Sequence, residues 1–128
     1  ELFDAVAEAS LMGDEIDSEQ ALGWTRDLLS AVAHVHRHGV AHGQLRPEHA
    51  LLDAGDSPKL LGFEPLSWRQ LRRGASRGAE HALRPVHHLD APELHGRSHA
   101  TAPELQAADV WALGVLGVAI FAGSGCRL

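Results

Sequence analysis

Apolar side chains recur at helical spacing along the stretch 17–39, which residues typical of helix ends also bound. Asp17 and Gln20 have the spacing of a capping box, and Gly39 is a suitable C-terminal stop. The positions expected to share the buried face are Leu22, Thr25, Leu28, Leu29, Val32 and Val35. The pattern therefore predicts a helix over residues 17–39 with one face turned to the core.

A second helix is predicted over residues 103–122, where Pro103 suits the first turn. Its second half is apolar nearly all round, which implies burial on most sides. The continuous apolar run, residues 110–122, has 13 residues. A bilayer-spanning helix needs about 20 apolar residues. We therefore expect a buried helix and no transmembrane segment.

Two short apolar runs, residues 50–53 and 58–61, flank the turn-rich stretch Ala54-Gly55-Asp56-Ser57. This arrangement predicts a small β-hairpin. Residues 69–84 (RQLRRGASRGAEHALR) have no sustained period, and we expect a loop there. The patterning as a whole is typical of a mainly α-helical α+β domain.

Composition narrows the class of protein. The chain has 128 residues, 45% of them hydrophobic, and a net charge of −6. This size suits one domain or part of one, and the negative charge gives no support for a nucleic-acid partner. Cys126 is the single cysteine, so no intrachain disulfide can form. A reducing intracellular compartment, cytoplasmic or organellar, is compatible with this.

Four short motifs follow one another at characteristic spacings. Residues 42–49 read HGQLRPEH, and Gly62-Phe63-Glu64 begins 13 residues after His49. A first APE, residues 91–93, ends 16 residues before the DVWALGV of residues 109–115. A second APE, residues 102–104, lies only 5 residues before Asp109, and we interpret the repetition as coincidence.

In this order, with the helix of residues 17–39, the motifs resemble the C-terminal lobe of the eukaryotic protein kinases, where they read HRDLKPEN, DFG, APE and DVWSLGV. The resemblance covers nearly the whole chain, beginning at residues 1–4 (ELFD). It implies a protein-kinase-like C-lobe, with the small hairpin beside the former catalytic loop. Residues 1–128 contain no Gly-rich loop and no VAIK lysine, so we expect a partial lobe that lacks the N-lobe and the last C-lobe helices.

The resemblance assigns catalytic roles to positions that are altered here. Gln44 stands where the family has its catalytic Asp, and an amide cannot accept a proton near neutral pH. His49 replaces a metal-binding Asn and Gly62 the DFG aspartate, although magnesium prefers oxygen ligands. Arg46 replaces the catalytic-loop Lys and keeps only its charge. We therefore expect a pseudokinase-like protein that binds neither ATP nor magnesium productively.

The positions that hold the lobe together are retained, by contrast. They are His42, Leu45, Pro47, Phe63, Glu93, Asp109 and Trp111. Among them, Asp109 is expected to accept backbone N–H groups of the former catalytic loop. Structural residues survive and reacting ones do not, which favours a protein-binding or scaffolding module.

Two alternatives stay open. The first is a divergent active Ser/Thr kinase of which this chain is a fragment, with the metal held by Glu64, reaching it from a shifted backbone, or by a residue outside the chain. The second is an architectural subunit of a large multi-protein complex. In every case we expect the apolar helix over residues 110–122 to be covered, either by other protein subunits or by missing parts of the same chain.

Other residues carry weaker hypotheses. His34 and His38 have metal-ligand spacing on a helix, and His87 with His88 adds two more imidazoles, but no third ligand is evident, so surface or capping roles are favoured. Ser76, after Arg73, resembles a substrate site of basophilic kinases and is a possible phosphoacceptor. The tryptophans are too dispersed for a stacking platform and are expected to pack in the core or at interfaces: Trp24, Trp68 and Trp111.

Overall fold

A computed structural model describes residues 1–13, 16–63, 80–83 and 89–123, and these ranges are mainly helical. The α-helices are α1 (Leu2–Met12), α2 (Ser18–Arg37) and α4 (Ala102–Gly123). The short elements are the 3-10 turns η1 (Pro47–His49) and η2 (Pro92–Leu94) and the strands β1 (Ala50–Leu52), β2 (Pro58–Leu60), β3 (Glu80–Ala82) and β4 (His99–Thr101). The predicted class, mainly helical with a small antiparallel hairpin, is confirmed.

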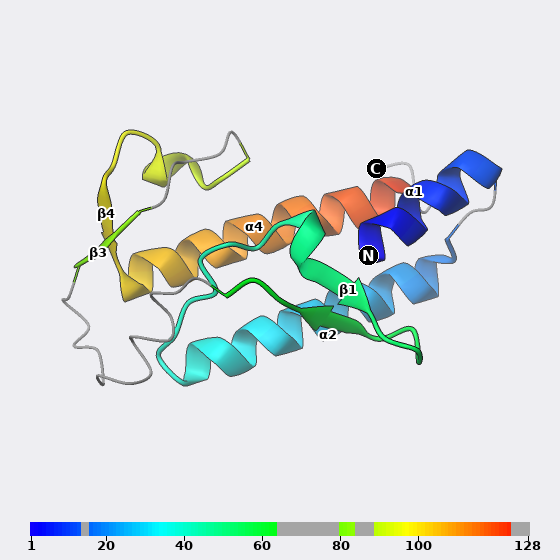
Figure 1. The fold of residues 1–128 in the computed structure, drawn as a ribbon, viewed down its shortest axis with the longest axis horizontal. Helices are drawn as coiled ribbons and strands as arrows, with labels where there is room; N and C mark the ends of the chain where they lie inside the picture. Colours follow the sequence, from blue (N-terminus) through cyan, green and yellow to red (C-terminus); the bar gives the residue numbers. More distant parts are fainter. Residues whose placement is uncertain (14–15, 64–79, 84–88, 124–128) are drawn as a thin grey trace.

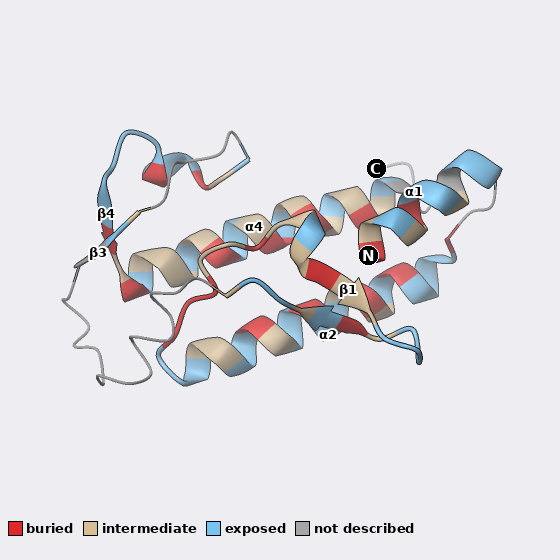
Figure 2. Ribbon diagram, viewed as in Figure 1, coloured by how far each residue is buried: buried red, intermediate tan, exposed pale blue. Residues whose placement is uncertain are grey.

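Helices α2 and α4 lie side by side and run in opposite directions (Figure 1). Helix α1 packs against α4, and the β1–β2 hairpin contacts both α1 and α2. The buried side chains between these elements form one hydrophobic core (Figure 2). Its members are Leu2, Val6, Ile16, Ala21, Trp24, Leu28, Val32, Leu45, Ala50, Leu113, Leu116 and Ile120.

The bounds of α2 agree closely with the prediction, but its cap does not. Asp17 is the N-cap residue, yet its side chain makes no capping hydrogen bond. The Gln20 amide instead donates to the Asp56 carboxylate in the hairpin turn. The predicted capping box is therefore wrong, because a tertiary contact takes its second member. At the other end, Gly39 has φ +73°, a backbone conformation that suits glycine.

The buried face of α2 is rotated from the predicted one. Ala21, Trp24, Leu28 and Val32 are buried. Leu22 and Leu29, expected on the same face, are 49% and 50% exposed. A helix advances 100° per residue, so the stripe that passes through Trp24 and Leu28 leaves these leucines at its edge.

The hairpin has the predicted position, with Ala50 opposite Leu60 and Leu52 opposite Pro58. The Asp53 carboxylate accepts the backbone N–H groups of Gly55 and Ser57, each at 2.9 Å, which closes the turn. These N–H groups, with Ser57 the larger cause, lower the pKa of Asp53.

The described part of the expected loop over residues 69–84 is partly a strand. Glu80–Ala82 forms β3 and pairs with His99–Thr101 of β4 in antiparallel register. Three residues are too few to give a period, so pairing with a distant segment decides the structure here. A small second apolar cluster lies nearby, formed by Ala91, Leu94 and Ala100. Residues 69–79 and 84 lie outside the described ranges.

The second APE motif opens α4. The Glu104 carboxylate accepts the Thr101 backbone N–H at 2.7 Å, and the Glu104 N–H approaches the Thr101 hydroxyl at 3.4 Å. This reciprocal pair is a capping box. Arg97 donates two hydrogen bonds to the same carboxylate, at 3.0 and 3.1 Å. These contacts lower the pKa of Glu104 to about 2, with Arg97 as the largest cause and Thr101 as the next.

Helix α4 is longer and less covered than the sequence predicts. Within Ala102–Ala122 an 18-residue stretch has a mean hydropathy of 1.8, so by length and composition the helix could cross a membrane. The core helix of a soluble protein can meet the same criterion. The prediction from run length counted only residues 110–122. Burial on most sides is also wrong, because Val110, Trp111 and Val118 are 60%, 47% and 56% exposed.

Candidate functional site

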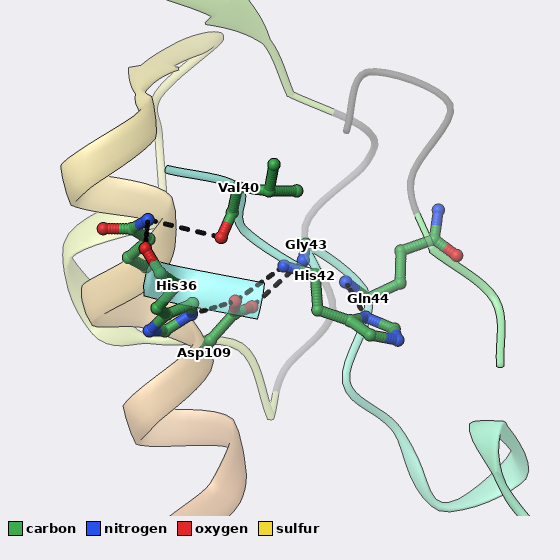
Figure 3. A network of polar contacts seen from close by, with 7 residues as sticks. His36, Val40, His42, Gly43, Gln44 and Asp109 are labelled. Carbon is green, nitrogen blue, oxygen red and sulfur yellow. Dashed lines mark hydrogen bonds and ion pairs between the residues drawn. The ribbon is translucent and has the colours of Figure 1, made fainter. Parts of the chain in front are cut away.

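Asp109 holds the loop of residues 42–49, which the resemblance matches to the kinase catalytic loop. Its carboxylate accepts the backbone N–H of His42 at 2.7 Å and that of Gly43 at 3.0 Å (Figure 3). Asp109 is 2% exposed and projects from α4. A buried carboxylate that accepts several N–H groups fixes their position strongly. These are the hydrogen bonds that the resemblance implies.

His36 is a third donor to the same carboxylate. Its Nε2 lies 2.8 Å from Asp109 Oδ2, and Gln106 on α4 donates to the carbonyls of His36 and Val40 at 3.4 and 3.2 Å (Figure 3). Together these contacts fasten the end of α2 to α4. Sequence reasoning missed both residues. The helical period could have found His36, since it follows buried Val32 by four positions.

His42 joins the loop to the segment that follows the hairpin. It is 1% exposed, and its Nδ1 lies 3.1 Å from the Gln44 backbone N–H. Because that N–H must donate, Nδ1 is the acceptor, and Nε2–H donates to the Leu61 carbonyl at 2.8 Å. The Phe63 ring lies against the imidazole, with centroids 4.4 Å apart. The retained positions His42 and Phe63 are thus in direct contact.

Three of the four altered positions also come together. His49 Nδ1–H donates to the Gln44 carbonyl at 2.6 Å. The His49 ring covers Gly62, because a Cβ built on Gly62 would lie 2.6 Å from His49 Cδ2. His49 therefore connects the other two positions, Gln44 through its backbone carbonyl and Gly62 through ring contact. Glu64, which could supply a carboxylate, lies outside the described residues.

Arg46, the fourth altered position, is a partly buried cation. Its Nε is buried and has no hydrogen-bond partner among the residues that the structure describes. Leu45 is buried at its side, and Pro47 begins η1. A cavity of about 160 Å³ lies next to these residues, with Leu89 and Leu116 among its other lining side chains.

Glu93 and Trp111 lie at the same groove on another side of α4. They line an open groove of about 610 Å³, whose other members are Ala107, Val110, Gly114, Val115 and Val118. The Trp111 indole N–H donates to the Leu89 carbonyl at 3.1 Å. Of the other tryptophans, Trp24 is 5% exposed in the core, as expected, and Trp68 falls outside the described residues.

The predicted histidine pair makes a local contact. The His38 ring N–H donates to the His34 carbonyl at 2.8 Å, and the ring centroids are 4.7 Å apart. Within the described ranges no group of three or more His, Cys, Asp or Glu side chains could hold a metal. His87, His88, Ser76 and Cys126 lie beyond those ranges, so their predictions stay open.

Comparison with known proteins shows distant similarity to protein kinases. Maternal embryonic leucine zipper kinase of Xenopus laevis is 32% identical over 96% of this chain and 17% of its own length. CBL-interacting protein kinase 28 of Oryza sativa subsp. japonica is 32% identical over 91% of the chain and 24% of its own length. Serine/threonine-protein kinase CHK1 of Mycosarcoma maydis is 29% identical over 85% of the chain and 16% of its own length.

The chain is thus kinase-like, with distant similarity to serine/threonine protein kinases over nearly its whole length. It spans only 17% of the first of these relatives and 24% of the second. No family model matches the chain, and no solved structure matches it significantly.

Proposed function

We propose that this chain is a catalytically inactive, kinase-like module that serves as a protein-binding or scaffolding element. One observation carries the proposal: the three positions that would supply the base and the metal ligands are Gln44, His49 and Gly62, and the His49 ring bonds to the Gln44 carbonyl and covers Gly62. The similarity to protein kinases is the reason for comparing these three positions with the catalytic motifs of that family.

The chemistry of phosphoryl transfer explains why these residues matter. The reaction depends on positioning and on metal ions that neutralise phosphate charge. An amide has no basicity near neutral pH, glycine has no side-chain ligand, and magnesium prefers oxygen to an imidazole nitrogen. The His49 Nδ1–H is, moreover, already directed at the Gln44 carbonyl. The site therefore lacks, at these positions, what the reaction requires.

The groove on α4 is the surface proposed for a protein partner or for another part of the same chain. Val110 and Val118 are more than half exposed there, and the exposed Glu93 carboxylate lies at the groove. Exposed apolar patches of this kind mark interaction sites. We infer that α4 is a packed central helix and not a membrane span, since Asp109 in its middle accepts backbone hydrogen bonds from the loop.

A phosphotransfer assay on the full-length protein tests the proposal. We expect no transfer from magnesium ATP to itself or to a generic basic-protein substrate, and no difference between the wild type and Gln44→Ala. Transfer that disappears in Gln44→Ala would establish the active-kinase alternative. An Arg26→Ala variant, on the exposed side of α2, controls for nonspecific loss of activity.

The architectural alternative is favoured by the exposure of Val110 and Val118. Size-exclusion chromatography separates it from a self-sufficient binding module. A soluble monomer of the isolated chain argues against an architectural subunit, whereas a chain that aggregates until a partner is co-expressed argues for one.

A further inference from the structure

The His49 imidazole lies where a side chain on residue 62 would have to lie. A Cβ built on Gly62 would be 2.6 Å from His49 Cδ2 and 2.7 Å from both Cγ and Nε2. Real Cβ atoms do not approach other heavy atoms so closely, so the ring or the backbone must move to admit even alanine. The residue at 62 and the side chain at 49 therefore depend on each other.

The ring is not free to swing away. Its Nδ1–H donates to the Gln44 carbonyl at 2.6 Å, while the His49 carbonyl accepts the Leu61 N–H at 2.8 Å. Both ends of the residue are thus tied, one to the loop and one to the segment beside Gly62. Moving the ring would leave the Gln44 carbonyl without this donor.

A second bond joins the same two segments. The buried His42 ring donates to the Leu61 carbonyl at 2.8 Å and packs on Phe63. Leu61 is therefore held through its N–H by His49 and through its carbonyl by His42. The residues on both sides of Gly62, Leu61 and Phe63, are therefore held in place, and Gly62 itself has φ +72°.

We propose that His49 and Gly62 form a steric lock, in which the imidazole fills the space of the absent side chain at 62 and fastens residues 42–49 to residues 61–63. The lock is a property of packing and does not require the chain to be inactive. Only one consequence of the lock rests on the proposed function. An aspartate introduced at position 62 cannot be accommodated beside His49. Recovery of a metal ligand at position 62 therefore requires a change at His49 as well.

Equilibrium unfolding of the full-length protein tests the lock without nucleotide or metal. We expect Gly62→Ala to raise the unfolding equilibrium constant about fivefold to a hundredfold more than Gly39→Ala does. Gly39 is a matched control, because its φ is +73° and nothing lies within 4 Å of a Cβ built there. Both changes place a Cβ on a residue with nearly the same positive φ, so the difference measures the contact with His49.

The double variant provides the decisive comparison. In a His49→Ala background we expect Gly62→Ala to be no more harmful than Gly39→Ala. An equal excess with and without the imidazole would overturn the lock. If Gly62→Ala alone does not fold, folding of Gly62→Ala/His49→Ala supports the lock, and failure of that double variant while Gly39→Ala/His49→Ala folds overturns it.

A titration with MnCl₂ separates the lock from the proposed function. We expect Gly62→Asp alone to gain no manganese binding. Stronger binding by Gly62→Asp than by Gly62→Asp/His49→Asn would contradict the lock. Phosphotransfer by the wild type would contradict the proposed function and leave the unfolding result intact.

Discussion

Helix α4 has two faces of similar hydropathy that differ in what they contact. On the inner face, Asp109 is 2% exposed and anchors the loop and the end of α2. On the outer face, Trp111 and Val118 are about half exposed, at 47% and 56%, and line the groove. Positions 109 and 111 are two helical steps apart, which puts them on nearly opposite sides.

The comparison teaches that hydropathy alone does not distinguish the two kinds of helix face. One is covered by the rest of the chain, and the other is left exposed. The polar residues distinguish them. Asp109 and Gln106 point to backbone groups that need partners, and so define the inner face. The outer face has apolar side chains at the groove. Changes on the inner face should therefore lower stability, and changes on the outer face should affect association.

The largest expected effect is that of Asp109→Ala. The change leaves the buried N–H of His42 and that of Gly43 without their acceptor, at about 1–3 kcal/mol for each unsatisfied donor. We expect the free energy of unfolding to fall by about 3 kcal/mol or more, as measured by urea denaturation. Asp27→Ala, on the exposed side of α2, should change it by less than about 0.5 kcal/mol. Equal effects of the two changes would refute the anchoring role.

A smaller effect is expected from His36→Phe. The ring volume is retained, but Asp109 loses one of its three donors, at 2.8 Å. We expect a loss of about 1 kcal/mol in the same denaturation experiment, since the two backbone donors remain. His34→Phe, on the exposed side of α2, is the matched control. Should both phenylalanine variants be as stable as the wild type, His36 would contribute nothing to the inner face.

The sequence predicts well the elements whose signals are local. Helix α2, the β1–β2 hairpin and the start of α4 follow from helical period, turn residues and Pro103. The hydrogen bonds of Asp109 were predicted as well, but from the family resemblance. No local pattern reveals that residues 42 and 43, so far from Asp109 along the chain, would meet it.

The two APEL copies show why local sequence is insufficient. Ala91–Leu94 supplies the short turn η2, whereas the same four letters at residues 102–105 begin the 22-residue helix α4. The second copy is preceded by Thr101, which completes a capping box with Glu104, and is supported by Arg97. The neighbours therefore decide the outcome, and the repetition interpreted as coincidence has a structural role in its second copy.

The contacts within the site were equally invisible in the sequence. His49 and Gly62 are recognised separately as altered positions, but their mutual packing depends on how the hairpin returns the chain to the loop. β3 is the same kind of case, since its three residues acquire their conformation by pairing with β4. Tertiary pairing of this kind leaves no period to detect.

On the outer face, Val118→Asp should leave stability within about 0.5 kcal/mol of the wild type, because the side chain is already 56% exposed. We expect it instead to weaken co-purification of the full-length protein with whatever covers α4, or to increase the solubility of the isolated chain. Leu22→Asp is the control, since Leu22 is a 49% exposed apolar residue on α2. If Val118→Asp and Leu22→Asp change co-purification and solubility equally, the groove is not a specific interaction surface.

The smallest effect concerns the N-terminal end of α4, where acid should weaken the cap. Arg97 and Thr101 hold the pKa of Glu104 at about 2, below its usual 4.5. A carboxyl whose pKa is depressed by folding stabilises the folded state fully above its unfolded value, and this contribution is lost as pH falls from about 4.5 toward 2.

Melting temperatures measured at steps through that pH range should therefore fall less steeply for Glu104→Gln than for the wild type. Solvent screens this exposed group, so the difference is expected to be modest. Arg97→Gln should flatten the profile too, because the guanidinium is the largest cause of the low pKa. Identical slopes of melting temperature against pH for all three proteins would mean that the contacts among Arg97, Glu104 and Thr101 do not stabilise the start of α4. Asp109 would then hold the inner face without a contribution from the cap.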